Sequence, residues 1–253
     1  MATEKLDFSL FDKFDFEYKP VGIKYSLKKP DDIDPLRKEL AICEMFKEAQ
    51  TSEPFYATRG TTQCGEHVVG YEEFPPLMYS GQLGPHFSMF KNALANRKVY
   101  DYIRLLPKDS VKYIIHSSYD RMTFDPDLMI FTTDTRQAEI LMRASSFASG
   151  DMWSMKGSTC LACVWLYSYP YMAGEVNFSI SGLGFSMKAR NVLPEGLILI
   201  SVPANQLPIL IDNLNEMEWE PEWFTLGREG FIDAVKKLDE DIIADYGMTD
   251  RWK

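Results

Sequence analysis

The sequence predicts an α/β (α+β) protein whose two pseudo-duplicated halves pack as one body, with an added C-terminal helix. Short β-rich segments alternate with segments of helical hydrophobic spacing along most of the chain, which is typical of mixed α/β domains. Four blocks of sequence also recur in the same order in the two halves, which indicates an internal duplication. At 253 residues, the chain is long enough for one large body made of two such units.

The composition favours a soluble globular protein and disfavours several kinds of partner. Apolar residues make up 45% of the chain, charged residues make up 25%, and the net charge is −10. A nucleic-acid surface would need clustered Lys and Arg, and an acidic balance disfavours binding to anionic membranes. The N-terminus has no signal-peptide pattern, and no run of eighteen apolar residues predicts a membrane helix. We therefore expect a cytoplasmic protein with no nucleic-acid or membrane partner.

Each half is expected to begin with a strand followed by a helix. The strands are predicted at VGIKYSL (21–27) and DLMIFTT (127–133), and the helices at DPLRKELAICEMFKEAQ (34–50) and TRQAEILMRASSFAS (135–149). In the first of these helices the apolar residues recur at helical spacing, at Leu36, Leu40, Cys43 and Phe46.

Two matching loop segments then follow in each half. The first half contains TRGTTQC (58–64) and SGQLGPHFSM (80–89), and the second contains MKGSTC (155–160) and SGLGFSM (181–187). The second Gly-rich segment equals the first with three residues removed, and Cys64 and Cys160 lie 96 positions apart. Strand–helix alternation alone does not produce this shared pattern, so we predict a duplicated unit of about 100 residues.

Each half is expected to end with a strand, a proline and a second helix. This pattern is shared by YDYIRLLPKDSVKYIIHSSYDRM (100–122) and GLILISVPANQLPILIDNLNEM (196–217), in which Pro107 and Pro203 are again 96 positions apart. This pattern places His116 on the predicted helix after Pro107. The halves span about 20–125 and 126–218, and residues 1–218 are predicted to form a single globular body.

Residues 219–253 are predicted to form a C-terminal helical extension. The segment REGFIDAVKKLDEDIIADYG (228–247) carries an apolar stripe made of Phe231, Val235, Leu238 and Ile242. Because such a stripe is normally buried, we expect it to pack against the body.

The two Gly–Thr–Cys loops combine groups that bind ligands. Each loop offers backbone N–H groups, hydroxyls, a thiol and a cation, and a helix that begins there would favour an anion. The alternative is a pair of tight turns in which Gly supplies a positive φ. The candidate ligand-binding residues are Arg59, Gly60, Thr62 and Cys64 in the first loop and Lys156, Gly157, Thr159 and Cys160 in the second.

The four cysteines form a second candidate site. Cys160 and Cys163 make a Cys-x-x-Cys pair, a spacing that suits one metal ion or a redox disulfide. If the halves bring their cysteines together, Cys43, Cys64, Cys160 and Cys163 could hold zinc or an iron–sulfur cluster. His67, three residues after Cys64, could also ligate a metal. The alternatives are buried packing residues, as at Cys43 on the helix stripe, or a lone reactive thiol.

Several segments resemble the uncharacterised domain-of-unknown-function family 169. They are KPVGIKYSL near the start, CEMFKEA followed about twenty residues later by TQCGEHVVGYE, and a late GSTC followed by a strand ending in Pro. The resemblance covers roughly residues 18–217, and it implies a bacterial or archaeal origin and a cytosolic α/β protein. It implies no activity, cofactor or catalytic residue. Cys163 and the acidic C-terminal tail are not part of the resemblance.

These observations favour a binding protein that holds a small ligand or cofactor between the halves, with the two Gly–Thr–Cys loops facing each other. One alternative is an enzyme with a thiolate, zinc or iron–sulfur centre at the same loops. Another is a structural or assembly protein without a ligand. The G-x-S-x-G, H-E-x-x-H and Walker patterns are absent from the sequence, so no catalytic residue is assigned.

Overall fold

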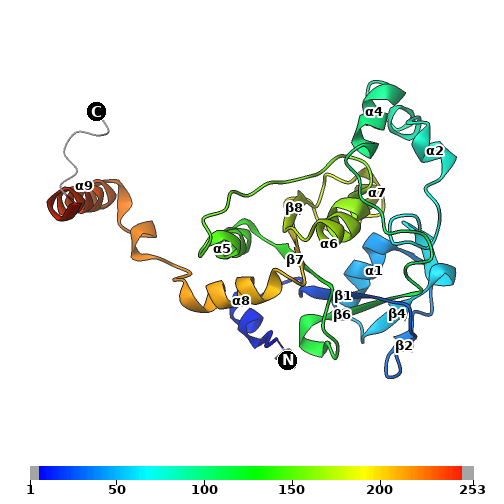
Figure 1. Cartoon of the computed structure of the whole chain (residues 1–253), viewed down its shortest axis with the longest axis horizontal. Helices are drawn as coiled ribbons and strands as arrows, with labels where there is room; N and C mark the ends of the chain where they lie inside the picture. Colours follow the sequence, from blue (N-terminus) through cyan, green and yellow to red (C-terminus); the bar gives the residue numbers. More distant parts are fainter. Residues whose placement is uncertain (1–5, 247–253) are drawn as a thin grey trace. The chain divides into compact units, whose positions relative to one another are not determined.

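A computed structural model of the chain describes residues 6–246 and contains a seven-stranded mixed sheet and a two-stranded sheet (Figure 1). The strands are β1 (Val21–Ser26), β2 (Asp34–Pro35), β3 (Leu40–Ala41), β4 (Phe55–Ala57), β5 (Thr62–Cys64), β6 (Tyr113–Ser118), β7 (Leu128–Thr133), β8 (Asn177–Ile180) and β9 (Ile198–Pro203). The α-helices are α1 (Ile42–Ala49), α2 (Pro76–Tyr79), α3 (Leu83–His86), α4 (Ala93–Tyr100), α5 (Thr135–Ser146), α6 (Tyr169–Ala173), α7 (Phe185–Ala189), α8 (Leu207–Glu216) and α9 (Gly227–Tyr246). Short 3-10 helices are η1 (Ser9–Phe14), η2 (Arg59–Thr61), η3 (Tyr119–Arg121) and η5 (Glu222–Phe224), and η4 (Val164–Ser168) is π-helical. The predicted mixed α/β class is confirmed.

Strand β1 lies at the centre of the large sheet. The strand order is β2-β4-β6-β1-β7-β9-β8, and β1 pairs antiparallel with both β6 and β7. In the register, Val21 lies opposite Ser118 on one side and opposite Ile130 on the other. Strands β2, β4, β6 and β1 come from the first predicted half and β7, β9 and β8 from the second. The β1–β7 pair therefore joins the two halves into one sheet.

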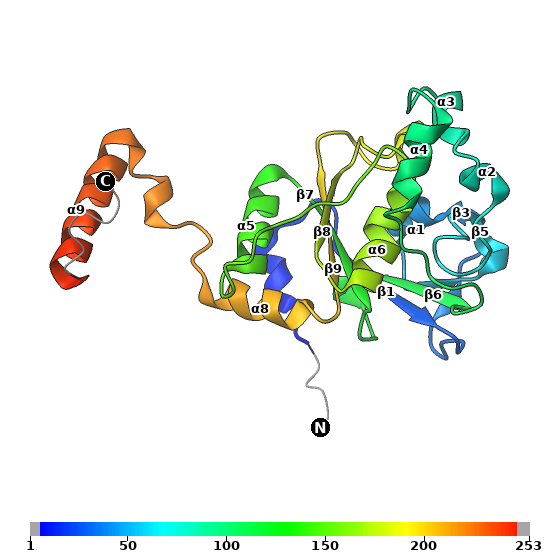
Figure 2. The same ribbon diagram turned by 45° about the horizontal axis from the view of Figure 1, so that its top comes forward.

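Helices cover both faces of this sheet (Figure 2). Helices α1 and α6, with η4, lie on one face, and α5 and α8 lie on the other. On the first face, Ile23 and Tyr167 belong to one continuous buried core. On the second face, Phe131 meets Phe11 edge-on, with ring centroids 5.1 Å apart. Helix α8 is attached to α5 by Asn213, whose side-chain N–H donates to a carbonyl of α5 at 2.7 Å.

The second half contains the four predicted strands and helices, and it also contains η4, α6, β8 and α7, which were not predicted. Strand β7, helix α5, strand β9 and helix α8 all lie within their predicted ranges. Asp134 caps α5 by accepting a hydrogen bond from the Gln137 N–H at 2.7 Å, and the Gln137 side chain accepts one from the Asp134 N–H at 3.1 Å. This reciprocal capping is a local signal, and it explains why the start of this helix can be read from the sequence.

The first half departs from the prediction in two places. The helix predicted from residue 34 begins only at Ile42, because Asp34–Pro35 pairs with β4 and the Leu36 N–H donates to the Tyr56 carbonyl at 2.8 Å. The strand predicted before Pro107 lies after it, as β6, so His116 is on a strand and not on a helix. Pro107 and Pro203 are therefore not equivalent, since Pro203 ends a strand and Pro107 lies in a loop.

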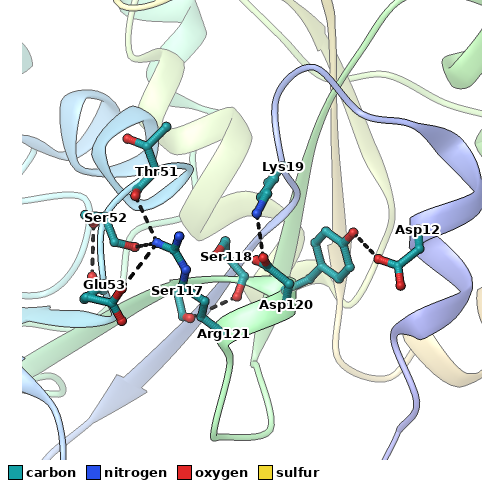
Figure 3. Close-up of polar contacts among 10 residues, drawn as sticks. Asp12, Lys19, Thr51, Ser52, Glu53, Ser117, Ser118, Asp120 and Arg121 are labelled. Atoms are coloured by element: carbon teal, nitrogen blue, oxygen red, sulfur yellow. Dashed lines mark hydrogen bonds and ion pairs between the residues drawn. The ribbon is translucent and has the colours of Figure 1, made fainter.

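Polar contacts after β6 hold the C-terminal end of α1 (Figure 3). Arg121 donates to the carbonyl oxygens of Thr51 at 2.9 Å and Ser52 at 2.8 Å, and both residues follow α1. Beside it, Lys19 pairs with Asp120 at 2.5 Å. Hydrogen bonds from a charged donor are stronger than neutral ones, so Arg121 attaches the end of α1 to η3. The Lys19–Asp120 pair attaches the segment before β1 to the same 3-10 helix.

The contacts divide the chain into two compact units, the first ending at Asn215 and the second beginning at Glu216. In the second unit, α9 confirms the predicted C-terminal helix. The side chains of its apolar stripe, Phe231, Val235, Leu238 and Ile242, are exposed. The packing of this stripe against the body stays a prediction. Among residues 6–246, no helix is both long enough and apolar enough to cross a membrane.

His116 of β6 is a fully buried histidine in the core beneath α1. Its ring stacks on Phe55 with centroids 5.3 Å apart, and its Nε2 lies 3.4 Å from the hydroxyl of Tyr167. Burial lowers the pKa of His116 to about 3, because the charged imidazolium loses its hydration. The folded protein therefore holds this ring neutral at pH 7.

We expect the free energy of unfolding to fall as the pH is lowered from 7 to 5, with His116 responsible for much of the loss. The unfolded chain binds a proton near pH 6.5, whereas the folded chain binds it only near pH 3. Stability is therefore present above the unfolded pKa and lost below it, by about 2 kcal/mol between pH 6.5 and 5. Urea unfolding at pH 7 and pH 5 measures the loss. The His116→Phe variant keeps an aromatic ring on Phe55 but does not titrate, so its free energy of unfolding should fall less between pH 7 and pH 5. A fall equal to that of the wild-type protein contradicts the prediction.

Candidate functional site

An apolar cavity of about 250 Å³ is lined by residues from both predicted halves. The first half supplies Ala41, Ile42, Cys43, Cys64, Gly65, His67, Met78, Leu83 and Phe87, and the second supplies Leu161, Ala162, Cys163, Phe185, Ser186 and Met187. Three of the four cysteines are among them. Apolar walls with a few convergent polar groups are typical of small-molecule sites.

The first two thiols come together because β3 pairs with β5. The two short strands run parallel, with Cys64 at the end of β5 opposite Ala41 at the end of β3. Helix α1 begins directly after Ala41, so Cys43 lies in its first turn, on the cavity wall beside Cys64. The Glu44 carboxylate accepts a hydrogen bond from the Ala41 N–H at 2.8 Å and caps the helix.

Close backbone approaches bring in the third thiol. Gly65 has a φ of +98°, and a Cβ there would lie 2.9 Å from a side-chain carbon of α1 and 3.8 Å from the sulfur of Cys163. A Cβ on Gly184 would lie 2.4 Å from the side chain of Ala162, so the turn that carries Cys163 packs directly on the segment before α7. Leu161 in this turn has a φ of 59°, a left-handed conformation that is strained for leucine.

Two phenylalanines from the repeated Gly-rich segments meet on the cavity wall. Phe87 belongs to SGQLGPHFSM and Phe185 to SGLGFSM, and their rings stack with centroids 5.2 Å apart. Phe87 is 46% exposed, so the pair lies at the solvent-facing edge of the cavity. The stacked rings therefore connect the two halves beside the thiols.

The thiols in the cavity are neutral at pH 7. Burial raises the pKa of Cys43 to about 12 and that of Cys163 well above its ordinary value. Burial also raises the pKa of the half-buried Cys64, but the positive charge of the nearby Arg190 opposes this because it favours the thiolate. Cys64 therefore ionises more readily than burial alone would allow.

His67 is one of the polar side chains of the cavity wall, together with Ser186. It is 9% exposed, its ring meets Phe74 edge-on at 5.4 Å, and its buried Nε2 has no hydrogen-bond partner among the residues that the structure describes. Burial lowers the pKa of His67, which keeps the imidazole neutral. Nε2 itself is covered by neighbouring atoms, so it is an unpaired nitrogen within the cavity wall.

Of the predicted residues in the first Gly–Thr–Cys loop, only Cys64 lines the cavity. Arg59 is paired with Glu72 at the surface, and Gly60 is exposed in η2. The hydroxyl of Thr62 is used inside the loop, since it donates to a nearby carbonyl at 2.9 Å. This loop therefore uses most of its polar groups on its own structure and on Glu72.

The predicted residues of the second loop lie outside the cavity. Lys156 and Gly157 line a separate surface groove. Cys160 is fully buried, and its carbonyl accepts a hydrogen bond from the Trp165 indole at 3.2 Å. The carbonyl of Thr159 accepts one from the N–H of Phe185 at 3.1 Å, which attaches the loop to α7.

The cysteines are brought together differently from the prediction. Cys43, Cys64 and Cys163 share the cavity, and Cys160 does not line it. Within the described part of the chain, no three His, Cys, Asp or Glu side chains are arranged to hold a metal ion. A zinc or iron–sulfur site on the four cysteines stays a prediction.

Sequence reasoning missed three residues of this region: Phe87, Phe185 and Arg190. The phenylalanines occupy equivalent positions of the repeated segments, so the repeat was the signal that could have found them. Arg190 follows α7 without any motif around it, and only the packing of α7 near β5 brings its cation to Cys64.

The fold and the cavity define a mixed α/β protein with a thiol-lined cavity between two parts of one body. The chain belongs to the DUF169 family, described as uncharacterised ArCR, whose model matches residues 9–213. The resemblance seen in the sequence is thereby confirmed, and every cavity residue lies inside the matched region. No curated protein and no solved structure matches the chain.

We expect iodoacetamide to alkylate Cys64 before the other three cysteines, and slowly at pH 7.5. The thiolate is the reactive form, and burial disfavours it at every cysteine of the cavity. Removal of the nearby cation by Arg190→Met should slow the reaction of Cys64 several-fold. Lys188→Met, which removes a cation paired with Glu195 instead, is the matched control. Peptide mass spectrometry measures the order of labelling, and earlier labelling of Cys43 or Cys163 contradicts the expectation.

Proposed function

We propose that the protein binds a small, largely apolar molecule in the cavity lined by Cys43, Cys64 and Cys163. The observation that carries the proposal is the apolar cavity of about 250 Å³, whose wall includes three thiols and the side chain of His67. A bound molecule would fill this cavity with apolar contacts.

The neutral state of the thiols favours an uncharged ligand body. Because burial raises the pKa of Cys43 and Cys163, no thiolate charge would repel or attract a ligand at pH 7. A charged group placed among these side chains would lose its hydration without compensation. The same raised pKa values favour binding over the alternative of thiolate catalysis, since the thiolate is the nucleophile.

Two polar side chains of the wall, His67 and Ser186, would orient the ligand. The hydroxyl of Ser186 can donate or accept a hydrogen bond, so it fits a ligand hydroxyl, carbonyl or amide. A few polar contacts in an otherwise apolar cavity favour one orientation of a small molecule.

An internal duplication would explain why the cavity lies between the halves. The strand order supports a duplication. From the centre of the sheet towards its edges, the order is β1, β6, β4 on one side and β7, β9, β8 on the other. On both sides the first strand of the half is central and its last strand lies next to it. The stacked Phe87 and Phe185 come from equivalent positions of the repeated segments. A cytoplasmic location would fit as well, because reducing conditions keep thiols free.

Binding of the neutral fluorescent probe N-phenyl-1-naphthylamine to the full-length chain tests the proposal. We expect saturable binding to the wild-type protein. The Ser186→Trp variant places a large ring on the cavity wall and should weaken binding at least about tenfold, because apolar contact area is lost. Ser149→Trp adds the same ring at an exposed position after α5 and should leave binding unchanged.

Two results would contradict the proposal: no saturable binding to the wild-type protein, or equal binding to Ser186→Trp. Circular dichroism and urea unfolding show whether each variant is folded. Should Ser186→Trp not fold, Leu83→Trp blocks the cavity from α3, where the side chain is half-buried.

A further inference from the structure

We infer that two copies of this chain pair through α9, with the two helices antiparallel. The helix lies outside the region that the DUF169 model matches, so the inference concerns a surface separate from the cavity and does not depend on the proposed function. It is carried by a narrow apolar seam along α9 and by the arrangement of charges along the same helix.

The seam consists of four apolar side chains that are between 38% and 52% exposed: Phe231, Val235, Leu238 and Ile242. Their spacing of four, three and four residues is that of the core positions of a coiled coil. The neighbouring Ile232 adds exposed apolar surface. A second helix that covers the seam would remove these side chains from water, which stabilises the pair.

Carboxylates border this seam on both sides. Asp239 and Asp241 are exposed, and at helical spacing they flank Leu238 and Ile242 from opposite sides. A broad surface packed on α9 would also cover these carboxylates, which costs their hydration. A single helix covers the seam alone and leaves both carboxylates in water, so the seam fits a helix as its partner.

The charges of α9 are unevenly distributed along its length. Residues 228–237 carry three cations and two carboxylates, whereas residues 238–242 carry three carboxylates and no cation. Arg228 continues the seam, three residues before Phe231. In a parallel pair, Arg228 would lie opposite its own copy and the acidic segment opposite its own copy. An antiparallel pair instead places each acidic segment beside the part of the other helix in which cations are in excess.

The seam is complementary to itself in the antiparallel orientation. Around a twofold axis between Val235 and Leu238, these two residues lie opposite each other, and Phe231 lies opposite Ile242 of the second copy. With a rise of about 1.5 Å per residue, Arg228 is then about 6 Å along the axis from the level of Asp241 in the other helix. An arginine side chain spans this distance. Each contact occurs twice, as in other isologous interfaces.

Sedimentation equilibrium of the full-length chain tests the inference. We expect a reversible dimer with a dissociation constant on the order of micromolar, because the seam spans only about two heptads. Leu238→Glu places a charge in the seam and should weaken dimerisation at least about tenfold. Lys236→Gln, which changes the net charge by the same amount on the outer face of the helix, should leave dimerisation unchanged.

Charge reversal tests the orientation. Arg228→Glu should weaken the dimer several-fold, because it places a carboxylate beside the acidic segment of the other helix. Asp239→Lys and Asp241→Lys, added to Arg228→Glu, should restore the affinity. A parallel pair would respond differently, since Arg228→Glu would only replace one like-charge pair by another.

Three results would overturn the inference: monomers at every concentration, a dimer that Leu238→Glu does not weaken, or a dimer that Arg228→Glu does not weaken. If the body of the same chain covers the seam, the protein stays monomeric and Leu238→Glu lowers the free energy of unfolding of the body. Circular dichroism shows whether each variant keeps its helix content. Should Leu238→Glu lose helix, Leu238→Gln removes the apolar contact without adding a charge.

Discussion

The antiparallel pairing of β1 with β7 is the contact on which the rest of the structure depends. It places Val21 opposite Ile130 and joins strands from both predicted halves into a single buried sheet. A central strand with partners on both sides leaves none of its backbone groups at a sheet edge. Once this pair is formed, the helices on each face and the loops that line the cavity pack on the same sheet. The cavity between the halves exists because they share one sheet.

Burial among apolar side chains decides the chemistry of the cysteines in that cavity. A thiol in such surroundings keeps its proton, as the raised pKa of Cys43 shows. Three neutral thiols and a neutral imidazole make a weakly polar lining, quite unlike the cationic Gly–Thr–Cys loops that the sequence suggests.

The charged groups that influence Cys64, which include Arg190, Glu44 and Glu66, are not among the residues that line the cavity. Arg190 follows α7, and its Nη1 lies 3.5 Å from the Glu44 carboxylate and 3.3 Å from the side-chain oxygen of Gln63, the residue before Cys64. Its positive charge opposes the rise that burial causes in the pKa of Cys64. The family match includes these residues, and other DUF169 proteins offer a natural comparison for the residue that aligns with Arg190.

By itself, the sequence determined the mixed α/β class, the family, the C-terminal helix and, in the second half, strands β7 and β9 with helices α5 and α8. These rest on local signals, such as the capping of α5 by Asp134, which act within a few residues. The tertiary structure alone decided that residues 113–118 form a strand, since pairing with β1 selects it. It also decided that Cys163, and not Cys160, joins Cys43 and Cys64. The position of Cys163 depends on contacts between distant segments and on the left-handed backbone conformation of Leu161. Neither feature leaves a pattern in a single sequence.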